Sequence, residues 1–577
     1  MGTEDTADQG FDRFEEFLKE WSRRDFLRRM GAAAAYTAFT AGIVDFLEAC
    51  GNNPTTTSQT PVKGGTVVEG WSTEPSYLLP VRSSDVYSNI ANRLMFEGLL
   101  YRDNKGNMLP NFAKDAPVQS ADGLTFTFKL RSDIKWSDGS PVTPDDVVFS
   151  YGLYYDSKFD GLLGNNRPTG KRYLKSVTAN GDTIVIQATT PYAPFLLTFG
   201  DVPVVPKKYL DGKTGVELNT DPFNSAPQVS NGKFKFSSWQ KGDKLTLVRN
   251  DGYFRGPVYL DSWVYKKASD SVAVLAQLKT GEVDAGRLDP ATFEEAKAQA
   301  NLNIVSFPTF SWDEAIFQVD PNKPAGKILG DKMVRQALIY GLDRAAILQA
   351  SYFGQGVVAD SVMPPISWAF NKDVTPKYPY DTNKAASLLD SAGWTKGSSG
   401  IREKAGQPLT FEMVTNADNT VRTKNLQIMQ EQWKKIGVDA KIRTVATLGQ
   451  LSNELTTART FGIMYIGFSL SPDPDQSGLW HTRQTAVGGN NGGLYKNPQV
   501  DMLLDQGVAE VDQAKRKSIY YQLQNLLADD PPSIMVCDTN GIYAVNKRVH
   551  NWNLNAYWIY GNGFSHYYQD VWVEPKK

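Results

Sequence analysis

The sequence predicts a mixed α/β protein built from at least two packed units. The chain has 577 residues, which is too long for one hydrophobic core. Its composition, 41% hydrophobic and 21% charged residues, is ordinary for a globular protein. Short apolar runs with strand-like alternation are interspersed with segments of helical periodicity, and no internal repeat is visible. The expected architecture is therefore two or more α/β lobes.

The first half of the chain is predicted to be rich in strands. Residues 66–69 form a short apolar run between glycines, and residues 124–130 alternate so that their apolar side chains share one face. Asn180-Gly181 and Lys241-Gly242-Asp243 lie between β-rich runs and predict two hairpins. Thr143-Pro144-Asp145-Asp146 predicts the start of a helix, because threonine can cap it and proline fits its first position.

The second half is predicted to be more helical. Residues 333–338 have helical spacing, and Asp343 can cap the helix that follows. A longer helix is expected at residues 419–436, between strands at about 409–414 and 438–443. This is βαβ order, which is typical of a parallel sheet.

Charge and composition exclude several function classes. Lys and Arg total 61 against 63 Asp and Glu, a net charge of −2. A chain this close to neutrality has no field to steer it onto nucleic acid, so nucleic-acid binding is not expected. The two cysteines, Cys50 and Cys537, lie too far apart in the sequence to indicate a disulfide framework. With only three histidines, neither a metal site nor a cofactor is expected.

The first fifty residues carry two export signals. Arg23-Arg24 precedes Phe-Leu and a small, weakly apolar stretch at residues 31–47, and this resembles a twin-arginine signal. The stretch runs into Leu-Glu-Ala-Cys, which resembles the box at which lipoproteins are cleaved and acylated. Residues 1–49 are therefore expected to be a twin-arginine-type lipoprotein signal. Lipidated Cys50 would hold the mature protein at the outer face of the cell membrane, or in the periplasm.

Two residues depart from that pattern. Asp45 puts a charge into the apolar stretch, and Glu48 stands where a small or aliphatic residue is usual. The alternative is an amphipathic or membrane-spanning helix, but the stretch falls short of the roughly 20 apolar residues that a hydrocarbon core requires. Residues 50–64, rich in Asn, Thr, Pro and Gly, predict a flexible tether.

From about Gly64 to the C-terminus, several short segments follow one another in a fixed order. They are FEGLLY at 96–101, LPNFA at 109–113, FKLRSDIKWSDG at 128–139, DDVVFS at 145–150, NGKF at 231–234, LVRN at 247–250, QLKTGEVD at 277–284, VRQAL at 334–338, GLDR at 341–344 and PDPD at 472–475. In this order they resemble the large extracellular solute-binding proteins of family 5, which serve peptide, oligosaccharide and nickel transporters.

The resemblance implies an α/β, two-lobe periplasmic-binding-protein-like fold of type II, in the large class with an extra subdomain. Lobe 1 would hold residues 65–305 with an inserted subdomain at about 102–206, and lobe 2 would hold residues 306–525. Residues 526–577 would return to lobe 1. The implied function is the solute-binding component of an ABC importer, a monomer that encloses a peptide or oligosaccharide-like solute and delivers it to the permease.

Most of the segments that carry the resemblance are interpreted as architectural. Residues 136–139 predict a turn beside a buried tryptophan, because Asp-Gly suits turn geometry. Arg335, within a predicted helix, is expected to be an ion-pair partner rather than a ligand contact.

The resemblance places ligand contacts in the loop after the first strand, in a loop of the second lobe before its long helix and in the segment before the Asp-Pro pair, and Asp473 and Trp480 are added as candidates. The expected contacts are Trp71, Ser72, Thr73, Asn416, Ala417, Asp418, Phe468, Ser469, Leu470, Asp473 and Trp480, with Trp312 as a further candidate. Backbone groups and small hydroxyls there could orient a ligand, while Trp71 supplies a flat apolar surface. Trp71 is equally compatible with a core position between the lobes, and Asp473 with a turn cap.

Two positions depart from the peptide-binding members of the family. Those members use a carboxylate for the α-amino group and, in some dipeptide binders, an arginine for the carboxylate. Here the corresponding residues are Leu470 and Asn416. Because a buried ammonium without a counter-charge is costly, a neutral solute is expected to compete with short zwitterionic peptides.

Three other function classes were compared with a solute-binding protein. An exported hydrolase would need a nucleophile with its base, a carboxylate pair or a metal, and no Gly-x-Ser-x-Gly or His-x-x-x-His motif is present. A dinucleotide enzyme is not indicated, because Gly354-Gln355-Gly356 follows a helical pattern rather than a strand. A ligand sensor of the same fold stays open. The protein is therefore not expected to be an enzyme.

Overall fold

The computed structural model describes residues 60–575, apart from 84, 104–105, 165–166 and 553–569. The chain divides into two compact units, Met1–Pro61 and Val62–Lys577, and every element described here belongs to the second. The predicted signal at 1–49, Cys50 and most of the tether lie outside the described residues. Among the helices that the structure describes, none is both long enough and apolar enough to cross a membrane.

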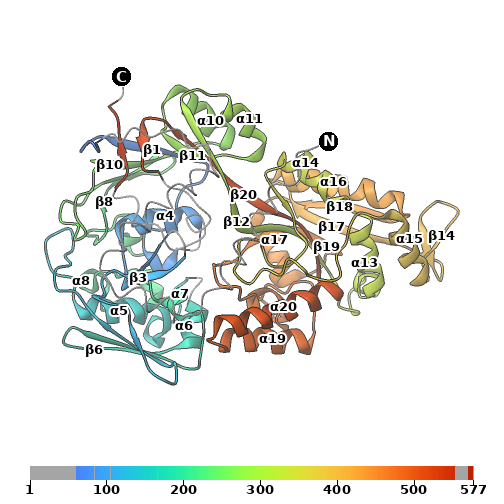
Figure 1. Cartoon of the computed structure of the whole chain (residues 1–577), viewed down its shortest axis with the longest axis horizontal. Coiled ribbons are helices and arrows are strands. Elements are labelled where there is room, and N and C mark those ends of the chain that lie inside the picture. The colour runs from blue at the N-terminus through green and yellow to red at the C-terminus, as the bar shows by residue number, and fades with distance from the viewer. Residues whose placement is uncertain (1–59, 84, 104–105, 165–166, 553–569, 576–577) are drawn as a thin grey trace, which may run out of the picture. The chain divides into compact units, whose positions relative to one another are not determined.

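One large sheet runs through Val62–Lys577 (Figure 1). Its strands are, in spatial order, β18 (Asp439–Val445), β17 (Thr410–Asn416), β19 (Ile463–Ser469), β12 (Leu302–Phe317), β20 (Ser533–Asn546), β11 (Ala285–Arg287), β1 (Thr66–Trp71), β10 (Ser262–Lys267), β9 (Lys244–Arg249) and β8 (Phe234–Gln240), with β13 (Gly356–Val358) paired to β20. The long strands β12 and β20 therefore join two half-sheets.

The pairing of β12 with β20 changes along their length. Residues 302–308 pair with 540–546, in the half-sheet that contains β1, β10 and β11. Residues 312–316 pair with 533–538, in the half-sheet that contains β17, β18 and β19. Each long strand thus starts in one half-sheet and ends in the other.

The register of this ladder shifts between Pro308 and Trp312, and we refer to residues 308–312 as the crossover. An irregularity of this kind lets the two parts of a sheet bend relative to each other. The hydrophobic clusters divide in the same way, since one gathers residues mainly from 67–265 and another residues mainly from 315–465. The strands and clusters thus fall into two parts, as the predicted two-lobe fold requires, and the residues at which the lobes divide stay a prediction.

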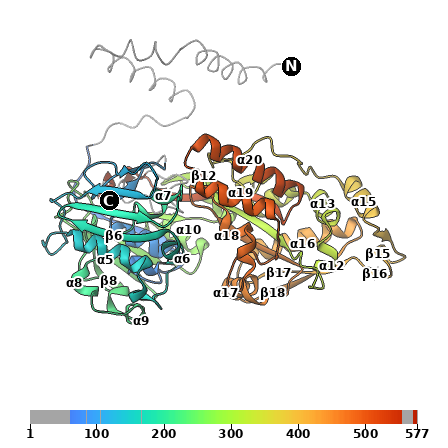
Figure 2. The same cartoon turned by 90° about the horizontal axis from the view of Figure 1, so that it is seen from below.

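Helices cover both half-sheets, as Figures 1 and 2 show. In chain order they are α4 (Val86–Met95), α5 (Pro144–Tyr155), α6 (Arg167–Tyr173), α7 (Phe195–Phe199), α8 (Lys207–Leu210), α9 (Gly215–Leu218), α10 (Ser271–Thr280), α11 (Phe293–Lys297), α12 (Gly326–Leu329), α13 (Lys332–Tyr340), α14 (Arg344–Tyr352), α15 (Thr382–Ser391), α16 (Thr420–Lys435), α17 (Leu448–Asn453), α18 (Ser477–Trp480), α19 (Pro498–Ala509) and α20 (Gln513–Asp529).

Smaller sheets complete the described chain. They comprise β2 (Leu100–Arg102) with β3 (Met108–Pro110), β14 (Thr395–Lys396) with β15 (Arg402–Lys404) and β16 (Gln407–Pro408), β21 (Val549–His550) with β22 (Trp572–Val573), and the sheet β4 (Val118–Gln119), β5 (Thr125–Lys129), β7 (Thr183–Ala188), β6 (Leu174–Asn180). The last of these, with α5, α6 and α7, forms what we call the inserted subdomain.

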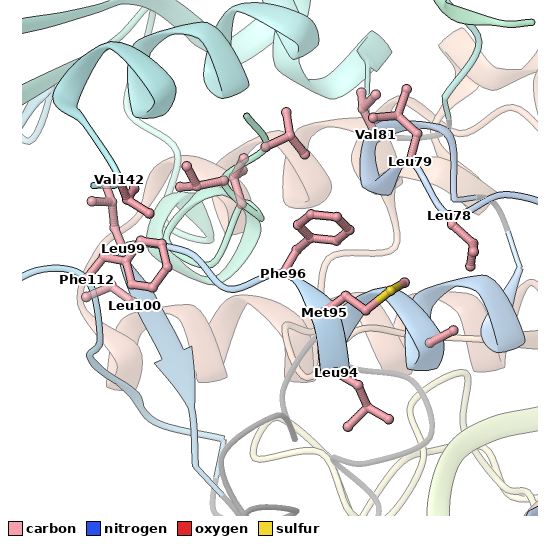
Figure 3. Close-up of a cluster of buried hydrophobic side chains, with 14 of the residues drawn as sticks. Leu78, Leu79, Val81, Leu94, Met95, Phe96, Leu99, Leu100, Phe112 and Val142 are labelled. Atoms are coloured by element: carbon pink, nitrogen blue, oxygen red, sulfur yellow. The ribbon is translucent and has the colours of Figure 1, made fainter. Parts of the chain in front are cut away.

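The local predictions for the first half are confirmed. The Asn180-Gly181 turn joins β6 to β7, and Lys241-Gly242-Asp243 joins β8 to β9. Thr143 caps α5 in a reciprocal capping box with Asp146. Figure 3 shows part of the hydrophobic core around the end of α4, where Met95 and Phe96 lie among apolar side chains of the segments before and after this helix.

The second half also follows its predicted pattern. β17 and β18 are parallel neighbours joined through α16, which is the expected βαβ unit. Asp343 caps α14, and Asn419 caps α16. Gly354-Gln355-Gly356 follows α14 and leads into β13, so it is a turn and lacks the strand that a dinucleotide-binding loop requires.

Several of the segments shared with family 5 meet at one buried ion pair. Lys233 Nζ lies 2.7 Å from Glu97 Oε1, and both side chains are almost wholly inaccessible to solvent. Tyr253 donates to the same carboxylate at 2.8 Å, and Asn111 donates at 3.0 Å. Burial alone would raise the pKa of Glu97, but Lys233 and these hydrogen bonds lower it. The motifs FEGLLY, LPNFA and NGKF are therefore parts of one structural joint.

Other shared residues also hold segments together. The Asp146 carboxylate accepts from Trp136 Nε1 at 3.4 Å and from the backbone N–H groups of Thr143 and Lys207, both at 2.9 Å. Arg335 pairs with Asp530 and donates to backbone carbonyls, which confirms its expected ion-pair role. These charged side chains stabilise the fold by satisfying buried backbone groups.

Candidate functional site

The strand directions bring the predicted contact loops to the crossover. β1 is parallel to β11, which runs antiparallel to β20, and β20 runs antiparallel to β12. β1 therefore runs as β12 does and ends on the crossover side of its half-sheet. β19 runs opposite to β12, and its last residue, Ser469, pairs with Ser311 at the crossover. The loops after β1 and β19 thus face the same junction from the two half-sheets.

Trp71, at the end of β1, is buried rather than displayed. Only 2% of it is exposed, and its ring stacks on Tyr265 with 3.6 Å between centroids and 27° between planes. Its indole Nε1 has no hydrogen-bond partner among the described residues, and the same holds for the Tyr265 hydroxyl. Ser72 Oγ lies 3.2 Å from the Tyr87 hydroxyl, and Thr73 is exposed. In this loop, exposed Thr73 therefore follows closely after Trp71, whose ring is buried and stacked on Tyr265.

A buried carboxyl lies on β1 two residues before Trp71. Glu69 accepts from Trp263 Nε1 at 3.2 Å and from the Tyr543 hydroxyl at 3.4 Å. Burial raises the pKa of Glu69 to about 7, against the smaller opposing effects of its hydrogen-bond donors. Glu69 is wholly inaccessible to solvent and belongs to the interior beside β1.

The loop after β17 is organised by an arginine that the sequence analysis missed. Asn416 is buried, donates to the Asp418 carboxylate, and accepts from Arg422 Nη1 at 3.1 Å. Arg422 Nε lies 3.5 Å from Asp313 Oδ1. The positive guanidinium of Arg422 therefore lies beside Asn416, the position at which some dipeptide-binding members of the family use an arginine. The sequence did contain a hint of this contact. Arg422 lies in the first turn of α16, and this turn directly follows the loop after β17.

Asp313 belongs to a buried hydrogen-bond network under this loop. The Tyr352 hydroxyl donates to Asp313 and lies 3.3 Å from the Tyr465 hydroxyl. Asn425 Nδ2 donates to the Tyr465 hydroxyl at 2.9 Å. These bonds fix the orientation of Asp313 and, through it, the guanidinium of Arg422.

The segment 468–470 follows β19 at the crossover. Phe468 is half-buried, Ser469 is exposed, and Leu470 is buried. Phe468 pairs in register with Trp312, and their ring centroids are 6.4 Å apart. Trp312 belongs with Leu470 and Trp480 to one hydrophobic cluster, so these predicted contacts are brought together but are mostly core.

Glu314 lies two residues beyond Trp312 on β12 and is wholly buried. Neither of its carboxyl oxygens makes a hydrogen bond with a described residue. Burial raises the pKa of Glu314 to about 7, although Ser533 and Trp312 lie close enough to oppose that shift. Burial thus favours the protonated form of this carboxyl, which has no ion-pair partner among the described residues.

Asp473 and Trp480 are engaged with protein groups. Arg516 donates to both oxygens of Asp473 at 2.9 Å, and Asp473 also accepts from the Asp475 backbone N–H at 3.0 Å. Burial raises the pKa of Asp473 even though Arg516 acts in the opposite direction. Trp480 Nε1 donates to Gln476 at 3.0 Å. The turn-capping interpretation of Asp473 therefore fits its geometry, and its charge is compensated within the protein.

No group of three or more side chains that could hold a metal ion occurs in the part of the chain that the structure describes. Glu69 and Glu314, which have strongly raised pKa values, are both inaccessible. The arrangement at the crossover offers a cation, amide groups and aromatic rings, which suit binding of an organic solute.

Comparison with known proteins agrees with this geometry. Residues 107–490 match the family of bacterial extracellular solute-binding proteins, family 5 Middle. The chain is 29% identical over 548 residues to the oligopeptide-binding protein AppA of Bacillus subtilis (strain 168), covering 89% of this chain and 96% of that protein. Protein XP55 of Streptomyces lividans is 30% identical over 537 residues, covering 92% of this chain and 93% of that protein.

Solved structures have the same fold. AppA from Bacillus subtilis in complex with a nonapeptide has a TM-score of 0.76 at 28% identity, and covers 89% of this chain and 100% of that one. NikZ from Campylobacter jejuni in complex with Ni(L-His) has a TM-score of 0.74 at 26% identity, with coverage of 85% and 96%. The family match spans more than half of the sequence. The chain therefore belongs to the bacterial extracellular solute-binding proteins of family 5.

Proposed function

We propose that the protein is the solute-binding component of an ABC importer that captures a peptide between its lobes and delivers it to the permease. The observation that carries this proposal is the convergence of the loops after β1, β17 and β19 on the crossover. A solute bound there would touch both lobes and would favour their closure. Similarity to an oligopeptide-binding protein supports a peptide as the solute.

The charges at this junction favour particular peptides. Leu470 supplies no carboxylate, and the carboxylate of Asp473 is held by Arg516. Neither of these two residues therefore offers a free counter-charge to an α-ammonium group, and burying such a group unpaired is costly. Longer peptides recognised through their backbone are therefore favoured over free di- and tripeptides. A neutral oligosaccharide-like solute is the second candidate, for the same reason.

A ligand screen by thermal unfolding tests the proposal. Three probe sets are used: a random nonapeptide pool, a pool of free di- and tripeptides, and neutral oligosaccharides. A solute that binds only the folded protein stabilises it by about 2.7 kcal/mol at a hundredfold excess over its Kd. We expect the nonapeptides to raise the melting temperature most. Tight binding of dipeptides would contradict the interpretation of Leu470 and Asp473.

The same pools separate binding from turnover. After incubation with the protein, their mass spectra should be unchanged, because among the residues that the structure describes the accessible groups of the junction include no nucleophile paired with a base. Product formation that disappears with a single acidic substitution would establish the hydrolase alternative. A sensor of the same fold would bind equally well, and genes for permease and ATPase subunits beside this one would instead indicate transport.

A further inference from the structure

The two lobes touch at a second place besides the crossover. The backbone N–H of Ala193, just before α7, donates to the carbonyl of Val508, near the end of α19, at 2.7 Å. Ala193 belongs to the inserted subdomain, whereas α19 packs against α20 in the hydrophobic cluster that contains Trp312. Figures 1 and 2 both place α7 beside α19.

On the subdomain side of this contact, two tyrosine rings are stacked. Tyr173, the last residue of α6, stacks on Tyr192 with 3.8 Å between ring centroids and 10° between planes. The Tyr192 hydroxyl lies 3.4 Å from Thr198 Oγ1 of α7. Ala193 follows Tyr192 directly, so the stacked rings fix the position of the N–H group that reaches Val508.

The opposite side carries compensated charges. Asp473 is paired with Arg516, and Arg483 Nη1 lies 2.9 Å from Asp505 Oδ1. These groups lie near the aromatic pair. Burial and then Asp475 raise the pKa of Tyr192. Burial also raises the pKa of Tyr173, and Asp475 and Asp505 are among the charges that act on it.

We propose that this contact is a latch that holds the lobes together. The latch consists of Ala193, next to the stacked rings of Tyr173 and Tyr192, on one side and of Val508 on the other. Separating the two sides would break the hydrogen bond between Ala193 and Val508, so this bond opposes opening. The latch rests on the proposed function only in assuming that the lobes separate to admit a solute.

Hydrogen exchange of the ligand-free protein tests the latch without any solute. The Ala193 amide should exchange more slowly than amides of exposed loops, because it is bonded whenever the latch is closed. An Ala193 amide that exchanges at the rate of an unprotected loop would overturn the proposal.

A matched pair of variants tests the consequence for lobe opening. Ala193→Pro removes the N–H, whereas Ala193→Ser retains it. Loss of one backbone hydrogen bond should increase the open population roughly 3- to 10-fold, seen as a larger radius of gyration in small-angle scattering. Ala193→Ser should match the wild type. Equal radii for all three proteins would contradict the latch.

A second variant guards against local misfolding by the proline. Tyr192→Ala removes the stacked ring but leaves the backbone unchanged, and should also enlarge the ligand-free protein, while Tyr192→Phe should not. These readouts separate the two proposals. If no solute binds but the amide is protected and the variants open, the proposed function fails and the latch stands. If solutes bind but opening is unaffected, the latch fails alone.

Discussion

Glu97 in the interior of lobe 1 and Glu314 on the strand that crosses between the lobes are both buried carboxyls, with 2% and 0% exposure. Glu97 has a lysine at 2.7 Å and accepts from Tyr253 and Asn111. Glu314 has no hydrogen-bond partner among the described residues. The charge of Glu97 is thus compensated by its neighbours, whereas burial favours the protonated form of Glu314 on the strand beside the junction.

The largest expected effect comes from unpairing Glu97. Lys233→Met keeps much of the side-chain volume but leaves the carboxylate buried without its counter-charge, which should destabilise the protein by about 3–5 kcal/mol. Urea unfolding measures this loss. Lys208→Met is the matched control, because Lys208 is exposed and lies 4.0 Å from Asp138, so its loss should cost under about 1 kcal/mol. Equal losses of stability in the two variants would show that the buried pair of Lys233 and Glu97 contributes no more than a surface pair.

Glu314 should make the free energy of unfolding depend on pH in the direction opposite to that expected from Glu97, whose pKa is lowered. Burial raises its pKa from 4.5 to about 7 in the folded protein. Its stabilising contribution is therefore fully present below about pH 4.5 and is lost as the pH rises to about 7, because folding then requires a proton that the unfolded chain has released. The shift corresponds to roughly 2–4 kcal/mol, and Glu69 contributes in the same direction.

The variant Glu314→Gln separates the contribution of Glu314 to this pH dependence from those of other groups, such as Glu69. The amide is neutral at every pH, so the free energy of unfolding should fall less steeply between pH 5 and pH 8 than in the wild type. Denaturant unfolding at several pH values provides the measurement. A variant curve parallel to that of the wild type would mean that Glu314 is not the group that titrates.

A smaller effect is expected from the cation beside Asn416. Arg422→Gln removes the partner of Asp313 and of the Asn416 carbonyl oxygen, and should cost about 1–3 kcal/mol of stability. Lys441→Gln is the control in the same half-sheet, since Lys441 is exposed and pairs with Asp439 at 2.9 Å, and surface pairs contribute little. If Arg422 also meets the solute, nonapeptide affinity should fall for this variant alone.

Local structure was predictable because it depends on neighbouring residues. Asn180-Gly181 and Thr143-Pro144 act through turn and cap geometry, and both predictions are confirmed. The candidate site was less predictable. Arg516 meets Asp473 across 43 positions, and no local pattern indicates such a pair. Arg422 was overlooked because the resemblance directed attention to position 416, whereas the guanidinium reaches that place from the next helix.

The smallest effect on stability is expected at Cys50, which lies outside the described residues. If Cys50 carries the lipid, Cys50→Ala should release the protein from membranes while changing the free energy of unfolding by less than about 0.5 kcal/mol. Cys537→Ala is the reciprocal control: Cys537 is wholly buried in β20, so its loss should lower stability by about 1 kcal/mol and leave anchoring intact. Membrane fractionation and mass spectrometry of the native N-terminal peptide measure the first variant, and thermal unfolding measures the second. An unmodified Cys50 in the membrane-bound protein would contradict the anchor, and replacing Arg23 and Arg24 with lysine would then show whether export itself depends on the arginine pair.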